Sequence, residues 1–157
     1  MLEFRRLSDQ YAQVMALFER APAYFQLAEG RGPTCEDARQ LLDETPPATP
    51  PEQKFVWGLE QDGLHGCLDL VRGYPDAETA FLGLLLVAED RRGLGLGRRA
   101  VEFALETARA WQCRRIRLGV LQANTAGLEF WQRFEFVLTG ETKGRILLME
   151  RPLPWGN

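Results

Sequence analysis

The sequence predicts a globular domain of the α/β or α+β class, and two observations carry that prediction. Apolar residues recur at helical spacing in some segments and alternate or run continuously in others, which gives the element order βααβββαβαββ. The chain has 157 residues, 45% of them hydrophobic, which suffices for one core in a single domain spanning 1–157. We expect that core to form without a metal or disulfides.

The first part of the chain is expected to be mostly helical after one short strand. Leu2 to Leu7 fit a strand, and Ser8 or Asp9 is the expected N-cap of a helix that Pro22 ends. A second short turn is expected over 23–28.

A capping box, a rigid loop and a hairpin are expected next. Thr34 begins the capping box, ahead of a further helix. The proline-rich segment 45–51 cannot continue that helix, because proline lacks the amide donor and fixes its own backbone torsion. Phe55 to Glu60 and Leu64 to Val71 fit the strands of a hairpin, joined by a turn that contains Asp-Gly.

The second half alternates strands with helices and ends in two strands. The first of its strands is almost entirely apolar, as in a strand covered on both faces. The expected elements, strand, helix, strand, helix, strand and strand, are Thr79 to Val87, Gly97 to Trp111, Ile116 to Leu121, Thr125 to Phe134, Phe136 to Leu138 and Ile146 to Met149, with a turn over 140–144.

Composition and charge exclude several classes of function. No apolar run approaches the roughly 18 residues of a membrane span, and the N-terminus lacks a signal-peptide pattern. The 22 acidic residues outnumber 17 arginines and two lysines, which disfavours a general nucleic-acid surface. Three cysteines without CxxC spacing and a single histidine predict neither a disulfide framework nor a zinc site. We expect a cytoplasmic protein with reduced thiols, no metal and no membrane.

A glycine-rich segment, Val87 to Arg98, links the apolar strand to the long helix. Its glycines at 93, 95 and 97 let backbone amides approach an anion, and the helix that follows adds its positive N-terminal dipole. This combination predicts a pyrophosphate cradle. The alternative interpretation is a plain turn that joins strand to helix.

The sequence lacks residues that two common classes of phosphate-binding site require. A P-loop needs Gly-Lys-Ser or Gly-Lys-Thr, but Gly97 is followed by Arg98 and Arg99. The segment from Gly95 to Ala100 fits G-x-G-x-x-A, but a dinucleotide site also needs an acid near the end of the next strand. Arg115 to Leu121 contains none.

The same loop resembles a third class. Its residues Arg92-Gly93-Leu94-Gly95-Leu96-Gly97 match the Q/R-x-x-G-x-G/A signature of the GNAT superfamily, the acyl-CoA-dependent N-acetyltransferases. The resemblance extends from about Leu82 to Phe136 and includes Asn124 ahead of an aromatic-rich helix. It implies a GNAT-like fold, with a mixed central sheet of six to seven strands splayed at the cofactor site and about four flanking helices. It also implies acetyl-CoA or coenzyme A as co-substrate.

The resemblance assigns cofactor contacts residue by residue. Leu85 and Val87 are expected to pair through their main chain with the pantetheine arm, and Asn124 to hydrogen-bond that arm or cap the next helix. The amides expected to hold the pyrophosphate belong to Arg92, Gly93, Leu94, Gly95, Leu96, Gly97 and Arg98. The extra phosphate of coenzyme A is expected to meet Arg91, Arg92, Arg98 or Arg99.

Two positions depart from the family pattern. Trp131 stands where the family often has a tyrosine whose hydroxyl protonates the leaving thiolate, and an indole N–H is not a usable proton source. Trp131 is expected to pack beside the acyl chain or thiol, or in the core. Glu135-Phe136 replaces the usual Gly-Phe.

An amine acceptor, with a pKa of about 10, must lose a proton before or during attack on a thioester. The expected base is Asp69 or Glu78, acting through water, and each has a surface role as its alternative. Tyr74 is expected to donate a proton to the thiolate, to contact the acceptor, or to pack on the sheet. Tyr24 and Phe25 are expected to line a partly aromatic acceptor pocket or the core.

The leading hypothesis is an N-acetyltransferase that moves an acetyl group from acetyl-CoA to a primary amine by direct attack in a ternary complex. The alternative is a CoA-binding regulatory or interaction module with little catalysis. The expected acceptor is a small-molecule amine or a peptide amine, and a homodimer is plausible. His65 is expected to be structural, and Trp155 to cover the domain or to lie in an interface.

Overall fold

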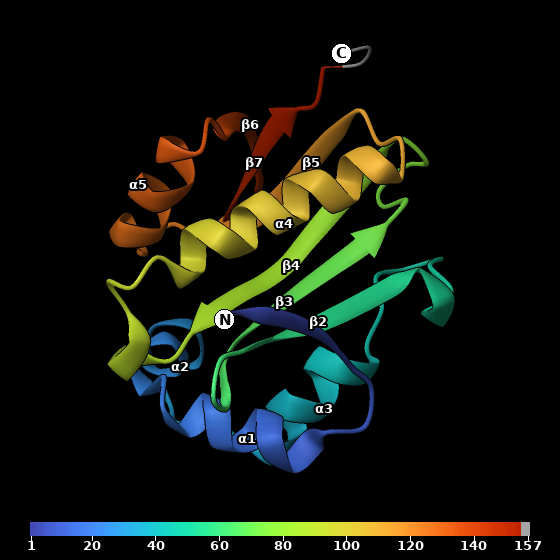
Figure 1. The fold of residues 1–157 in the computed structure, drawn as a ribbon. Helices are drawn as coiled ribbons and strands as arrows, with labels where there is room; N and C mark the ends of the chain where they lie inside the picture. The colour runs from blue at the N-terminus through green and yellow to red at the C-terminus, as the bar shows by residue number, and fades with distance from the viewer. Residues whose placement is uncertain (155–157) are drawn as a thin grey trace.

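The computed structural model describes residues 1–154, which fold around one seven-stranded sheet of order β1-β2-β3-β4-β5-β7-β6 (Figure 1). Only the central pair, β4 and β5, is parallel. The strands are β1 (Glu3–Leu7), β2 (Lys54–Glu60), β3 (Leu64–Arg72), β4 (Thr79–Val87), β5 (Arg115–Leu121), β6 (Val137–Lys143) and β7 (Ile146–Pro152). Trp155 lies outside the described residues.

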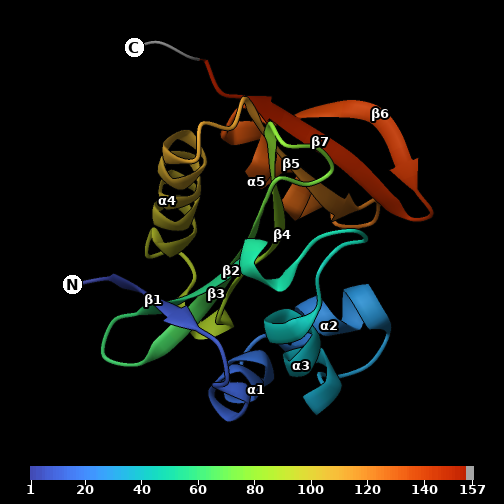
Figure 2. The ribbon, with the colours of Figure 1, turned by 90° about the vertical axis from the view of Figure 1, so that its right-hand side faces the viewer.

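Helices cover both faces of the sheet. They are α1 (Tyr11–Glu19), α2 (Pro22–Glu29), α3 (Cys35–Asp43), α4 (Leu96–Ala110) and α5 (Thr125–Arg133), with short 3-10 segments η1 (Pro51–Gln53) and η2 (Glu89–Arg91). One core packs α4 and α5 on the sheet, and a second packs α1, α2 and α3 on its opposite face (Figure 2). This is the expected mixed architecture, with five helices where about four were expected.

The predicted start of α1 was wrong. Its N-cap is Gln10, whose side-chain Oε1 accepts hydrogen bonds from the backbone amides of Ser8 and Asp9. Ser8 and Asp9 therefore donate hydrogen bonds to the Gln10 side chain and do not cap the helix. Pro22 follows the end of α1 and begins α2 at its first turn, where a missing amide costs nothing.

Two other sequence predictions concern the start of α3 and the turn between β6 and β7. The capping box is confirmed, because Thr34 Oγ1 accepts from the amide of Asp37 and the Asp37 carboxylate accepts from the amide of Thr34. The expected turn over 140–144 was too long, since β6 continues to Lys143. Gly140 lies in β6 with φ +90°, within an irregularity between Leu138 and Thr142.

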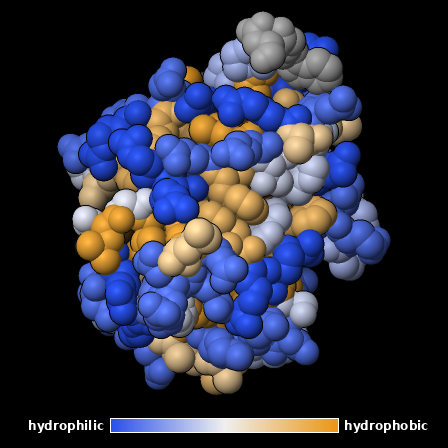
Figure 3. Space-filling model, viewed as in Figure 1, coloured by the Kyte–Doolittle hydropathy of each residue, from blue (hydrophilic) through white to orange (hydrophobic). Residues whose placement is uncertain are grey.

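The face that carries α4 is unevenly covered. Hydrophilic side chains lie over α4, and an apolar area lies beside it over the strands (Figure 3). Partly buried aromatic rings pack at this side of the core, and Phe4 stacks on Phe103 with 4.1 Å between ring centroids. Within residues 1–154, no helix has the length and apolar character required to traverse a bilayer.

Candidate active site

The two parallel strands at the centre of the sheet separate halfway along. β4 and β5 pair only from Thr79 with Arg115 to Leu82 with Leu118. Beyond Leu82, β4 stays paired with β3, up to Val87 opposite Gly66, while β5 stays paired with β7. The edge of β4 that faces β5 therefore has no strand partner over 84–87 among the described residues, which leaves main-chain groups for another extended molecule.

The glycine loop follows this free edge and leads into α4. Gly93 and Gly95 have φ of +79° and +82°, and a Cβ at either position would meet nothing within 4 Å. Gly95 is the N-cap of α4 and has no side chain to occupy the space ahead of the helix. The loop thus presents backbone amides and a helix N-terminus to open space, as an anion cradle requires.

The third glycine of the loop packs against a neighbouring helix. A Cβ on Gly97 would lie 3.2 Å from Cε1 of Phe130, so Gly97 allows α4 and α5 to pack closely. Its φ is not positive, and it also lines the cavity. The sequence pattern could not show this contact, because the contact depends on where α5 lies.

The start of the loop is anchored to the N-terminal helices. Arg20 donates to the Leu64 carbonyl and to His65 Nδ1 and pairs with Asp90, and the Glu89 carboxylate accepts from the amide of Ala23 in α2. His65 Nε2 lies 2.9 Å from the Gln61 carbonyl, so Nε2 carries the hydrogen and Nδ1 accepts from Arg20. The expected structural role of His65 is consistent with these contacts.

A cavity of 1410 Å³ opens between the separated strands, the loop and α5. It exceeds the roughly 300–1,000 Å³ of typical single-ligand pockets. Leu85, Val87, Gly93, Gly95 and Gly97 line it, as do Leu96, Asn124 and Trp131. Leu94 is 64% exposed at the tip of the loop, outside the lining.

Positive side chains gather at the end of the cavity near the loop. Arg91, Arg92 and Arg98 line it, whereas Arg99 does not. Arg98 lies over the ring of Phe134, 5.1 Å from its centroid. Arg133 of α5, which sequence reasoning missed, also lines this end. A cluster of arginine side chains suits phosphate groups, which each guanidinium can meet with two N–H donors.

Asn124 and Trp131 each make structural contacts within the fold and also line the cavity. Asn124 is the N-cap of α5, and its Oδ1 accepts from the amide of Gly127 at 2.9 Å. Its Nδ2 remains as a donor at the cavity. Trp131 is 8% exposed and packs edge-on against Phe136, with the ring centroids 5.3 Å apart, while part of it still reaches the cavity wall.

The separation of the strands coincides with a buried carboxylate. Gly83 is an extra residue in β4, because Asp69 pairs with Leu84 and Leu70 pairs with Leu82. Gly83 lines the cavity, and Asp69 lies directly behind it. Asp69 Oδ2 accepts from Lys54 Nζ at 3.0 Å, and both side chains are at most 10% exposed. Burial raises the pKa of Asp69, and the Lys54 ammonium opposes that rise.

The other proposed catalytic residues lie apart from each other. Tyr74 lines the cavity and packs edge-on against Phe81, 5.4 Å between centroids. Glu78 is exposed at the start of β4, does not line the cavity, and pairs with Arg114 at 2.8 Å. Tyr74 is therefore part of the cavity wall, Asp69 lies behind Gly83 and outside the lining, and Glu78 is exposed away from the cavity.

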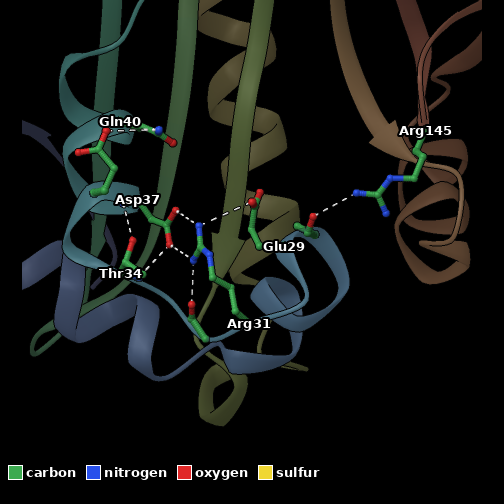
Figure 4. Close-up of polar contacts among 9 residues, drawn as sticks. Glu29, Arg31, Thr34, Asp37, Gln40 and Arg145 are labelled. Carbon is green, nitrogen blue, oxygen red and sulfur yellow. Dashed lines mark hydrogen bonds and ion pairs between the residues drawn. The ribbon is translucent and has the colours of Figure 1, made fainter.

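The remaining wall is built from α2 and the β6–β7 hairpin. Tyr24 lines the cavity and burial raises the pKa of its hydroxyl, whereas Phe25 is 4% exposed in the core beneath. Arg145 donates to the carbonyl of Ala28 at 3.4 Å and so bridges the two walls (Figure 4). Arg117, Glu141 and Lys143, none of them anticipated, also line this side.

The end of α2 is held by a network of charged side chains. Arg31 pairs with Asp37 at 2.8 Å and with Glu29 at 3.6 Å, which ties the end of α2 to the first turn of α3 (Figure 4). Among residues 1–154, no group of three or more histidine, cysteine or acidic side chains is arranged to hold a metal ion.

Comparisons with known proteins agree with this architecture. Residues 14–136 match the model of the acetyltransferase (GNAT) family. An acetyltransferase from Thermus thermophilus superposes with a TM-score of 0.83 at 30% identity, over 98% of this chain and 97% of that one. PaiA N-acetyltransferase from Thermoplasma acidophilum, solved with coenzyme A, shares the fold at a TM-score of 0.72 and 18% identity, over 97% of this chain and 99% of its own.

One curated relative matches a shorter region. The 5-NmdU N-acetyltransferase of Pseudomonas phage PaMx11 is 34% identical over 70 residues, which is 45% of this chain and 46% of the phage protein. The chain thus matches about half the length of that relative.

The separated parallel strands and the glycine loop before α4 define the fold of an acyltransferase. The chain belongs to the acetyltransferase (GNAT) family. Membership in this family implies acyl transfer from an acyl-CoA donor.

Proposed function

We propose that the protein is an N-acetyltransferase that moves an acetyl group from acetyl-CoA to a primary amine by direct attack. The observation that carries the proposal is the free edge of β4 over 84–87, which opens onto the glycine loop at one end and onto Gly83 and Asp69 at the other. A thioester lying along that edge would have its phosphates at the loop and its acyl group near Asp69.

The chain offers a matching group for each part of the donor. Main-chain groups at Leu85 and Val87 suit the amides of a pantetheine arm, and Asn124 Nδ2 can donate to the same arm. The amides of the loop from Arg92 to Arg98 suit the pyrophosphate. Arg91, Arg92 and Arg98 are the arginines placed to meet a further phosphate.

The proposed reaction needs one proton acceptor and one proton donor. The amine nitrogen attacks the carbonyl carbon of the thioester, so that a C–N bond forms, the C–S bond breaks and the electron pair leaves with sulfur. The proton of the amine passes to Asp69 through water, since the carboxylate lies behind Gly83. Tyr74 donates a proton to the thiolate. Glu78 is not retained as the base, because it is exposed and paired with Arg114, whereas Asp69 adjoins Gly83 of the cavity wall.

The acceptor is proposed to enter between α2 and the β6–β7 hairpin, where Tyr24 and Tyr74 line the wall. The name of the phage relative makes the amine of 5-NmdU one acceptor worth testing. We place it in a panel with ethanolamine, lysine and spermidine.

Calorimetric titration with acetyl-CoA and with coenzyme A tests the donor site. We expect micromolar binding that Gly95→Glu abolishes, since a carboxylate would then occupy the anion cradle. The matched control is Gly140→Glu, because Gly140 also has positive φ and open space but does not line the cavity. Absence of binding by the wild type would refute the proposal.

Turnover with the amine panel tests the chemistry. We expect Asp69→Asn and Tyr74→Phe each to lower kcat by about 10²-fold or more while binding of coenzyme A persists. Binding without turnover for any amine would instead favour a CoA-binding module with little catalysis. That function is the second candidate because Trp131 stands where the family often has a proton-donating tyrosine.

A further inference from the structure

The buried pair between Lys54 and Asp69 is asymmetric. Lys54 begins β2, Asp69 lies on β3, and Nζ meets only Oδ2, at 3.0 Å. The second oxygen, Oδ1, is buried and has no hydrogen-bond partner among residues 1–154. A buried carboxylate oxygen without a donor is costly in free energy, and the Lys54 ammonium on Oδ2 offsets part of that cost.

The cation of this pair is one of two lysines in a chain that has 17 arginines. An arginine guanidinium is a rigid fork that meets both oxygens of a carboxylate, whereas a lysine ammonium is a compact charge that can bind one. The choice of lysine therefore keeps the negative charge on Asp69 compensated and leaves Oδ1 unengaged.

The pair lies at the place where the strands separate. Gly83 lines the cavity, and an added Cβ on it would be 2.4 Å from Asp69 Oδ2, so this oxygen lies next to the backbone of Gly83. Gly83 directly follows Leu82, the last residue of β4 that pairs with β5. The carboxylate is thus held beside the end of the open edge.

We propose that Lys54 is the positioning residue of the acyl transfer: it holds Asp69 in the ionised form through Oδ2, the oxygen next to Gly83, so that the carboxylate receives the proton of the amine through water. The inference rests on the proposed function of Asp69. Lys54 itself does not touch the substrates, and it acts only through the carboxylate.

The charged surroundings of Asp69 allow Lys54 to have this effect. Lys54 on β2 is the cation that lowers the pKa of Asp69, against the rise caused by burial. On β3, Cys67 faces the same core, and burial raises the pKa of its thiol, which stays neutral. Gly83 and Leu84 of β4 carry no titratable group. Burial also raises the pKa of Tyr24 of α2, which lies near Cys67.

A direct test is a carbon-13 NMR titration of the Asp69 carboxyl group in the free protein, with Asp69→Asn used to assign the signal. We expect Lys54→Met to move the titration midpoint up by about one to three pH units, because an opposite charge within contact distance is lost. Lys54→Arg keeps the positive charge and should leave the midpoint at or below the wild-type value. Lys54→Gln serves as a second neutral variant if the methionine variant does not fold.

The matched control is Arg5→Met, which removes a cation paired with Glu60 at the other end of β2. It should leave the Asp69 midpoint unchanged. An unchanged midpoint in both neutral Lys54 variants, or an equal shift in Arg5→Met, would overturn the proposal.

The pH profile of kcat/KM with the most active amine of the panel gives the second readout. A base must be deprotonated, so the rate falls as pH falls through its pKa. Neutral variants at position 54 should therefore move the acid limb to higher pH by the same interval as the NMR midpoint, with coenzyme A binding unchanged. A limb that does not move would overturn the proposal. Lack of turnover in the wild type would refute the proposed function and leave the NMR test of Lys54 intact.

Discussion

A side chain at position 83 would collide with the carboxylate of Asp69, the base of the proposed reaction. A Cβ there would lie 2.4 Å from Asp69 Oδ2 and 3.1 Å from Cγ. Asp69 cannot move away freely, because Oδ2 is bonded to Lys54 and the side chain is buried. At this residue the requirement for glycine comes from a neighbour's carboxylate and not from backbone torsion, since φ of Gly83 is not in the positive region.

Gly83→Ala is predicted to impair chemistry more than donor binding. The added methyl group displaces the Asp69 carboxylate, so we expect kcat to fall by about tenfold or more. Steady-state kinetics with acetyl-CoA and the best amine, together with calorimetry, would measure both effects.

Gly58→Ala is the control for crowding within the sheet. A Cβ there would lie 2.5 Å from Leu64 Cδ1, the end of a flexible side chain that can turn aside, and Gly58 does not line the cavity. Its kcat should stay within about twofold of the wild type, because the reacting groups keep their positions. Equal losses in the two variants would show that crowding of the sheet, and not Asp69, limits the rate.

At the scale of elements, α3 is fixed by its first turn. The Asp37 side chain is 10% exposed, accepts from the amide of Thr34 at 2.8 Å and pairs with Arg31. The hydrogen bond from Arg31 is the main cause that lowers the pKa of Asp37, with the Thr34 amide adding to it. Because Arg31 also contacts Glu29, this carboxylate connects α3 to the end of α2.

Asp37→Asn is predicted to lower the free energy of unfolding by about 1 kcal/mol at pH 7, the usual cost of a lost capping contact. A carboxyl whose pKa is lowered on folding stabilises the protein above its unfolded pKa, and that stability is lost as pH falls through the folded pKa. The difference between wild type and variant should therefore shrink below about pH 4 in urea-unfolding curves.

Glu36→Gln provides the comparison in the same turn. Glu36 is exposed and pairs with Arg39 on the surface of α3, so its replacement should change the unfolding free energy less than Asp37→Asn. A difference for Asp37→Asn that stays constant from pH 7 to pH 3 would contradict the assigned role of the carboxylate.

The elements that sequence reasoning located correctly have strong local signals, and the errors occur where a signal has two meanings. The capping-box residues Thr34 and Asp37 marked the start of α3, and the Asp-Gly pair marked the turn between β2 and β3. Pro22 ends a helix or begins one, and the sequence alone did not show that it begins α2. Gly140 suggested a turn but lies in an irregularity of β6, which tertiary pairing with β7 imposes.

The candidate site was predictable where its residues are consecutive. Gly93 and Gly95 could be proposed from the sequence because they share one loop with the start of α4. Lys54 escaped notice because it meets Asp69 only through the pairing of β2 with β3. The role of Gly83 depends on the extra residue in β4, and no pattern in Thr79–Val87 marks it.

At the scale of the whole molecule, the sheet behaves as two parts that share one short parallel contact. β1 to β4 carry α1, α2 and α3, while β5, β7 and β6 lie beside α5 (Figure 1). Over 84–87 and 119–121 the two parts are joined by no β4–β5 pair. The loop spans them, since η2 is bonded to Arg20 and Gly97 packs on Phe130. A donor bound along β4 would add the contacts that this region lacks.

Donor binding is therefore predicted to stabilise the molecule as a whole. A ligand at 100 times its Kd adds about 2.7 kcal/mol to the free energy of unfolding, which for a chain of this size raises Tm by roughly 5–10 °C. Differential scanning calorimetry with coenzyme A would measure the shift, and Gly95→Glu should abolish it. Hydrogen exchange should slow most over 84–87 and 92–97 and least in β1, which lies at the far edge of the sheet. Slowing confined to the loop, without the β4 edge, would mean that phosphates bind there while the pantetheine arm does not lie between the strands.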